Sequence, residues 1–271
     1  MPPEYIDLSF WQVAIAASLI LIGGAVSLGL QLGLERRLLW AAVRTVVQLL
    51  LVGLVLKWIF APGQPWYVVV GMAMAMTLIA GGAAVRRSER RYRGVWLDSV
   101  ISMWASSWLI AAVALFGVLQ VQRQNHPWYQ PQYAIPLLGM ILGNTLNGIA
   151  LGFDRLSEEL AGKRDQVETL LALGGTRWEA ARSAIQTAVR TGMIPTINSM
   201  MVVGLVSLPG MMTGQLLGGV SAMQAVMYQI VIMFLIAAGT SLGTVCIVLL
   251  SYRRLFTARH QFLPAKLANG R

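Results

Sequence analysis

Residues 154–190 read DRLSEELAGKRDQVETLLALGGTRWEAARSAIQTAVR and form the only long polar segment of an otherwise apolar chain. Five hydrophobic runs precede this segment and two follow it. A chain arranged in this way presents most of its aqueous surface in one place. We therefore expect residues 154–190 to be the region that binds a soluble partner.

The first half of this segment has the pattern of an amphipathic helix. Leu156, Leu160 and Val167 recur at intervals of four and seven residues, which places them along one helical face with the charges opposite. Gly174 and Gly175 end the helix, because glycine accepts the left-handed conformation that a helix C-terminus commonly needs.

A second helix is expected to start at once. Thr176 is placed to cap it, and Glu179, three residues later, completes a capping box. Trp178, Ala181 and Ile185 then form its apolar stripe. Two interpretations of the segment stay open: a docking surface for a partner, or an amphipathic helix that only lies on the membrane.

Composition indicates an all-α integral membrane protein. The chain has 271 residues, of which 56% are hydrophobic and 12% charged, and its mean hydropathy is +0.64. About seven windows are long enough to cross a hydrocarbon core of roughly 30 Å as helices. These windows are residues 10–33, 38–60, 66–85, 95–121, 133–153, 191–218 and 224–251. We expect a single transmembrane domain over 1–271, with the cytoplasmic region 154–190 within it.

The net charge of +10 is explained by the placement of the basic residues. They gather in alternate loops, at residues 36–37, 86–93, 154–190 and in the C-terminal tail, whereas the opposite loops hold only Lys57 and Arg123. By the positive-inside rule the N-terminus is outside and the polar segment and C-terminus are cytoplasmic. The expected setting is a multi-pass protein of a cell membrane, the bacterial inner membrane, with lipid and not nucleic acid at its basic surfaces.

Two pairs of polar residues lie inside the expected spans. Arg44 and Gln48 share one face of the second span near its cytoplasmic end, where Arg44 either snorkels to the interface or faces a translocation path. Asn144 and Asn147 lie three residues apart in the fifth span. Amides in lipid are costly unless paired, so they either bond neighbouring helices or line a cavity.

Residues 191–218 are irregular in sequence, with Pro195, Pro209 and several glycines. The basic residues on both sides place the flanking segments inside, so this stretch must cross the membrane together with 224–251. Backbone freed at a break is tolerated in lipid only where protein or a watery cavity satisfies it. The substrate path is therefore expected near 198–214. Its candidate residues are Asn198, Ser207, Pro209, Met211 and Met212, together with Arg44, Gln48, Asn144 and Asn147.

The chain carries no motif for catalysis of its own. The only Gly-Lys pair, Gly162-Lys163, does not fit a P-loop, and neither H-E-x-x-H nor G-x-S-x-G is present. The single Cys246 allows no disulfide or cysteine metal cluster within one chain, and two distant histidines cannot build a catalytic site. We expect a chain that is not an enzyme and binds no cofactor itself, with metal ligands undetermined.

Several sequence patterns resemble one transporter family. The segment ETLLALG from Glu168 to Gly174 is similar to the loop of ABC-transporter permeases that docks on the ATP-binding subunit. LALGGT at 171–176, VGLVSLPGMMTG at 203–214 and the tail YRRLF..RHQ at 252–261 resemble, in order and spacing, the Fet-type iron-export permeases. That family includes plant aluminium-tolerance permeases.

The resemblance implies an ABC exporter permease for iron or another metal ion. It implies a dimer of this chain and a separately encoded ATP-binding subunit, with ATP and magnesium on that subunit. The coupling residues it implies are Glu168, Leu171, Leu173, Gly174, Gly175, Thr176 and Trp178.

Other functions stay open from the residues alone. An organic substrate such as a lipid or a sugar nucleotide is compatible with the scarcity of carboxylates in the spans. A docking subunit without transport and a passive channel also fit the missing P-loop.

Overall fold

The computed structural model describes residues 9–61, 63–86, 88, 90–120 and 127–267. The chain forms two compact units, Met1–Gln64 and Pro65–Arg271, each of which we describe by itself. Arg87 and Arg123, which contribute to the charge asymmetry, lie outside the described residues.

The first unit is a hairpin of two long helices, α1 (Phe10–Gly29) and α2 (Glu35–Ile59). Its turn is closed by Ser27, whose hydroxyl accepts a hydrogen bond from the Leu34 amide at 2.9 Å and donates to the Glu35 carboxylate at 2.9 Å. Nearly all the apolar side chains of both helices are exposed, as expected of helices that face lipid.

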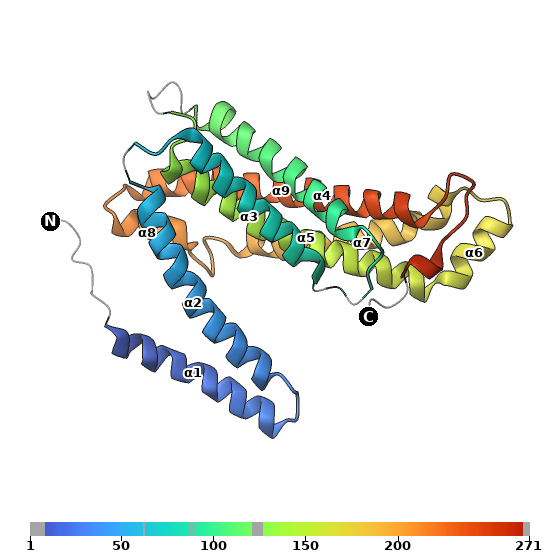
Figure 1. Ribbon diagram of the computed structural model, residues 1–271, viewed down its shortest axis with the longest axis horizontal. Helices are drawn as coiled ribbons and strands as arrows, with labels where there is room; N and C mark the ends of the chain where they lie inside the picture. The colour runs from blue at the N-terminus through green and yellow to red at the C-terminus, as the bar shows by residue number, and fades with distance from the viewer. Residues whose placement is uncertain (1–8, 62, 87, 89, 121–126, 268–271) are drawn as a thin grey trace. The chain divides into compact units, whose positions relative to one another are not determined.

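The second unit is a bundle whose long helices run alongside one another (Figure 1). In chain order its helices are α3 (Trp66–Arg86), α4 (Val95–Ala112) with a π-helical end η1 (Val113–Val118), α5 (Pro131–Gly162), α6 (Arg164–Ala172), α7 (Arg177–Val202), α8 (Gly210–Leu217), α9 (Ala222–Leu255) and the short 3-10 helix η3 (Pro264–Leu267). Isolated β-bridges pair Val203 with Ser207 and Phe256 with Phe262.

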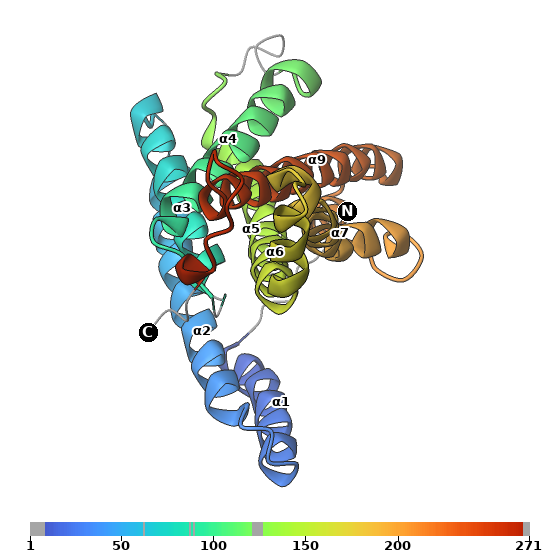
Figure 2. The ribbon, with the colours of Figure 1, turned by 90° about the vertical axis from the view of Figure 1, so that its right-hand side faces the viewer.

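Helix α5 is the centre of the second unit and contacts α3, α4, α7 and α9 (Figure 2). Small residues set the closest approach. A Cβ on Gly192 of α7 would lie 2.7 Å from the Gly148 carbonyl oxygen of α5 and 2.6 Å from Thr244 of α9. Three helices can therefore meet here only because these positions carry no side chain, which is the usual device of helix packing in lipid.

The prediction of a helical multi-pass membrane protein is confirmed. Among the residues that the structure describes, six helices are long and apolar enough to cross a membrane: α1, α2, α3, α4 with η1, α5 and α9. The seventh expected span, 191–218, is divided between the end of α7, a non-helical segment at 203–209 and α8.

The break in that region is shorter than its two prolines suggest. Pro195 lies inside α7 and the helix continues to Val202, so the expected break at 195–210 is confined to residues 203–209. Gly204, with a φ of +82°, starts the irregular segment, and Pro209 caps α8. Glycine accepts such a conformation without steric cost.

The polar segment 154–190 also divides differently from its apolar pattern. Helix α5 continues past the apolar run to Gly162, and Lys163 separates it from α6. The first expected amphipathic helix is therefore two helices. The second one, starting at Thr176, forms as predicted.

Candidate functional site: helix corner and substrate path

The turn from α6 to α7 forms a rigid corner, which we define as residues 168–178. Gly174 has a φ of +88°, and its amide donates to the Leu171 carbonyl at 3.1 Å. The Gly175 amide donates to the Leu170 carbonyl at 2.9 Å, and a Cβ on Gly175 would lie 2.8 Å from that same oxygen. Both glycines are therefore required by the turn, as the sequence predicts.

The capping box predicted at the start of α7 is present. The Thr176 amide donates to the Glu179 carboxylate at 2.7 Å, and the Glu179 amide donates to the Thr176 hydroxyl at 3.3 Å. The backbone hydrogen bond from Thr176, and then its hydroxyl, lower the pKa of Glu179 below 4.5. Glu179 thus stays ionised at the positive end of the helix dipole.

Leu173 is the most exposed apolar side chain of the corner, at 80%. Trp178 and Leu170 are also exposed, whereas Leu171 packs against the core of the bundle. Glu168 forms an exposed ion pair with Arg164 at 2.7 Å. The corner therefore has an anchored inner side and an apolar outer tip.

The corner is braced by the C-terminal tail, which we define as residues 256–267. The Arg177 amide donates to His260 Nδ1 at 2.9 Å, and the Arg177 guanidinium donates to the Thr257 carbonyl at 3.3 Å. The Trp178 ring packs edge-on against Tyr252 of α9, with centroids 5.7 Å apart. The sequence patterns marked the tail at 252–261 but did not indicate that it contacts the corner.

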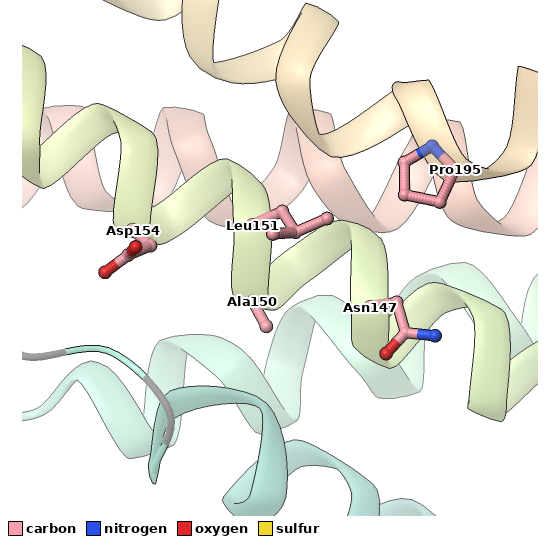
Figure 3. A pocket seen from close by; sticks show the side chains of 5 residues that line it. All are labelled: Asn147, Ala150, Leu151, Asp154 and Pro195. Carbon is pink, nitrogen blue, oxygen red and sulfur yellow. The ribbon is translucent and has the colours of Figure 1, made fainter. Parts of the chain in front are cut away.

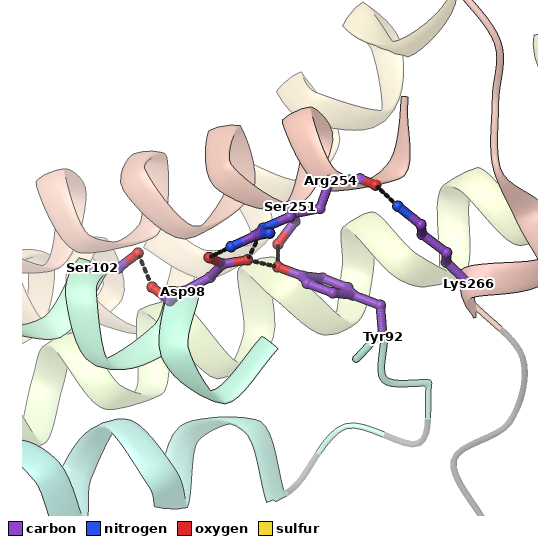
Figure 4. A network of polar contacts seen from close by, with 6 residues as sticks. All are labelled: Tyr92, Asp98, Ser102, Ser251, Arg254 and Lys266. Atoms are coloured by element: carbon purple, nitrogen blue, oxygen red, sulfur yellow. Dashed lines mark hydrogen bonds and ion pairs between the residues drawn. The ribbon is translucent and has the colours of Figure 1, made fainter. Parts of the chain in front are cut away.

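A polar network around the buried Asp98 carboxylate joins α4, α9 and the tail (Figure 4). Tyr92 donates to the Asp98 carboxylate at 2.6 Å, and Arg254 donates to both oxygens of that carboxylate at 3.3 Å. Lys266 of the tail donates to the Arg254 carbonyl at 3.0 Å. Burial and, next, the hydrogen bond to Asp98 raise the pKa of Tyr92 above its ordinary value, so its hydroxyl remains a donor.

This network was only partly visible in the sequence. Asp98 lies in the first turn of α4, whereas Arg254 lies 156 residues further along the chain. Only the packing of α9 against α4 brings the two charges together.

An open groove on the surface of α5 and α7 has a volume of about 370 Å³. Its lining residues are Asn147, Ala150, Leu151, Asp154 and Pro195 (Figure 3). Asp154 accepts a hydrogen bond from Ser88 at 2.9 Å. Asn147 belongs to the lining of this open groove, whereas Asn144 donates to the Met140 carbonyl of its own helix at 2.9 Å.

The nine candidate path residues divide between the two units, two in the first and seven in the second. Arg44 and Gln48 belong to the first unit. When the Gln48 amide oxygen is turned toward Arg44, that oxygen accepts a hydrogen bond from the Arg44 guanidinium at 3.0 Å. In the second unit, Asn198 is exposed on α7 and Ser207 is exposed in the broken segment. Met211 packs in the core on one side of α8. Met212 instead lines a separate cavity.

The sequence profile of the uncharacterised protein family UPF0014 matches residues 10–256, nearly the whole chain. The chain belongs to UPF0014. A UPF0014 membrane protein of Synechocystis is 42% identical over 249 residues, which cover 90% of this chain and 93% of the relative. No solved structure matches the chain.

Other relatives of this UPF0014 protein carry more informative names. The probable iron export permease protein FetB of Escherichia coli is 30% identical over 260 residues, which cover 94% of this chain and 95% of the relative. The protein ALUMINUM SENSITIVE 3 of Arabidopsis thaliana is 27% identical over 248 residues, covering 92% and 88%. The predicted family resemblance is confirmed.

Proposed function

We propose that this chain is the permease subunit of an ABC exporter that moves iron or another metal ion out of the cytoplasm. A separate ATPase subunit drives it by docking on the helix corner. The observation that carries this proposal is the exposed Leu173 at the tip of a rigid, braced corner, in a chain that is 30% identical to a protein named as a probable iron export permease.

The chemistry of the corner suits a partner with an apolar groove and an acidic rim. Leu173 and Trp178 supply apolar surface, and positive charge comes from Arg177 of the corner and from Arg259, the neighbour of the His260 that contacts Arg177. Exposed apolar groups rimmed by polar ones are typical of protein interaction sites. This outer tip is on the side that the basic residues predict to be cytoplasmic.

Helix α7 provides a mechanical link from the corner to the path. It has 26 residues and is about 39 Å long at about 1.5 Å per residue. It runs from the capped corner past Pro195 at the groove to the broken segment at 203–209. A displacement of the corner by the ATPase would therefore move the groove wall and the break together.

The exposed polar groups of α5 and α7 support a dimeric permease. Asn147 and Asn198, which lie within the expected spans, are exposed on the surface of the second unit. Amides that face hydrocarbon are costly, so such a face is normally covered by protein or lines water. A second copy of the chain placed over this face would enclose a polar path between the two copies.

The test is ATP hydrolysis by the chain reconstituted in proteoliposomes with its ABC ATP-binding subunit. We expect ferrous iron to stimulate hydrolysis, and Leu173→Glu to abolish both the stimulation and the binding of the ATPase. The matched control is Leu32→Glu, because Leu32 is also an exposed leucine and lies in a turn on the same expected side of the membrane. Equal loss in both variants, or no loss in Leu173→Glu, would contradict the docking site.

A further inference from the structure

The broken segment encloses a second cavity whose lining comes from three helices. Residues of α7, of 203–209, of α8 and of α9 surround a space of about 460 Å³. Its lining residues are Met200, Val203, Gly204, Leu208, Met212, Val226, Gln229, Ile230, Met233 and Phe234. The volume is in the range of pockets that hold small organic ligands.

Gln229 is the polar side chain in this lining, and one of its atoms lacks a partner. The residue is 7% exposed, and its amide oxygen accepts no hydrogen bond from any residue that the structure describes. A buried acceptor without a donor is costly, and native proteins normally satisfy such atoms. An unpaired oxygen on a residue that lines an apolar cavity favours a ligand that brings a donor of its own.

The other lining residues favour a neutral, mainly apolar ligand. The cavity has no carboxylate, imidazole or thiol among its lining residues, so a metal cation would find no charged ligand there. Met200, Met212 and Met233 are flexible and polarisable, and such side chains adapt to ligands of irregular shape.

The cavity is also accessible from the side of the bundle. Phe234 and Ile230 belong to its lining and are exposed on α9, one of the helices apolar enough to cross a membrane. A ligand dissolved in the bilayer would therefore meet exposed apolar side chains that also line the cavity.

We propose that this cavity binds a neutral amphiphile from the bilayer. The apolar body of the ligand packs against the methionines and Ile230, and its hydroxyl or amide N–H donates to Gln229 Oε1. This site is separate from the groove at Asn147 and does not depend on the proposed metal export.

A matched pair of photoreactive ligands tests the proposal on the full chain in nanodiscs. One is a long-chain fatty alcohol with a diazirine in its chain, and the other is the methyl ether of the same molecule, which cannot donate. We expect the alcohol to label cavity residues at about fivefold lower concentration than the ether, the difference that one hydrogen bond of typical strength provides. Mass spectrometry of the labelled peptides locates the site.

Variants distinguish the contribution of the Gln229 amide to ligand binding from the contribution of the cavity volume. Gln229→Leu should bring the alcohol to the level of the ether, whereas Gln215→Leu, which removes a similarly unpaired amide oxygen on α8 outside the cavity lining, should keep the difference. Met200→Trp should reduce labelling by both ligands because it fills the cavity, and Met201→Trp should not, because Met201 is exposed outside it. Gel filtration confirms that each variant is folded.

Equal labelling of the wild type by alcohol and ether, or labelling confined to other residues, would overturn the proposal. So would a fivefold difference that persists in Gln229→Leu. None of these readouts uses the ATPase. The proposal of an amphiphile site and the proposal of an exporter can therefore be refuted independently of each other.

Discussion

Single residues at the helix corner carry strict backbone requirements. Gly174 occupies the left-handed region, with open space where a Cβ would be, so its requirement is conformational rather than steric. A non-glycine residue in that region costs about 1–2 kcal/mol. The stability of the corner therefore depends on this one position more than on any side chain around it.

Replacing this glycine gives a prediction with a matched control. Gly174→Ala should lower the free energy of unfolding by about 1 kcal/mol. Gly162→Ala, at the last position of α5 where space is also open and φ is not positive, should leave stability unchanged or raise it. Unfolding of the purified protein by SDS in mixed micelles measures both. A larger loss in Gly162→Ala than in Gly174→Ala would show that the corner is not held by this conformation.

Tyr92 gives a second prediction at the same scale. Tyr92→Phe removes the hydroxyl that donates to the buried Asp98 carboxylate. Leaving a buried acceptor short of its donor costs about 1–3 kcal/mol, so the same unfolding measurement should show a loss of that size. Tyr67→Phe, at an exposed tyrosine of α3, is the control and should change stability little. Equal stability of the two variants would mean that solvent satisfies Asp98.

At the scale of elements, the tail is a brace for the start of α7. His260 has a φ of +58°, and its Nδ1 accepts a hydrogen bond from the Arg177 amide. One residue therefore both turns the tail and provides an acceptor for an amide at the start of α7. The first amides of a helix have no partner within it. The tail thereby fixes the direction in which α7 leaves the corner.

Substitutions at His260 should show whether the contact between the tail and α7 is needed for coupling to the ATPase. His260→Ala loses the acceptor and the tolerance for positive φ, whereas His260→Asn keeps both. We expect His260→Ala to lower substrate-stimulated ATP hydrolysis severalfold with its ATPase subunit, and His260→Asn to keep most of it. Unstimulated hydrolysis should change little in either variant. Stimulation that survives fully in His260→Ala would exclude the tail from coupling.

At the scale of the whole molecule, the open question is what covers the polar face of α5 and α7. The groove at Asn147 and Asp154 is exposed in a single chain, and Asn198 is exposed on the neighbouring α7. The proposed dimer covers this face with a second copy. This arrangement makes the groove internal to the assembly.

Cross-linking tests the dimer directly. In a Cys246→Ser background, Asn147→Cys should be linked to a second copy by a short bifunctional thiol reagent in native membranes, because the two α5 faces meet. Leu109→Cys, at an exposed position of α4, should remain monomeric under the same conditions. Cross-linking of Leu109→Cys and not of Asn147→Cys would place the interface on another face.

Local chemistry explains which features could be predicted from the sequence. The apolar runs, the glycine corner and the Thr176 capping box depend on residues within four positions of each other, so their patterns predicted the helices of the membrane domain and the turn between α6 and α7. The sequence indicates an irregular stretch over 191–218, and only the tertiary structure limits the break to residues 203–209. Pro195 is accommodated within α7, and the chain leaves the helix at Val203.

The sequence by itself determined that this is a multi-pass helical membrane protein of a permease-containing family, because hydropathy, glycine placement and family motifs are local properties. Only the tertiary structure decided which distant residues come together: Asp98 bonds Arg254, His260 bonds Arg177, and Gln229 lines one cavity with methionines of α7 and α8. These contacts join positions on different helices. They depend on how the helices pack. Small residues such as Gly148 and Gly192 permit close packing, but no local sequence pattern specifies which helices pack together.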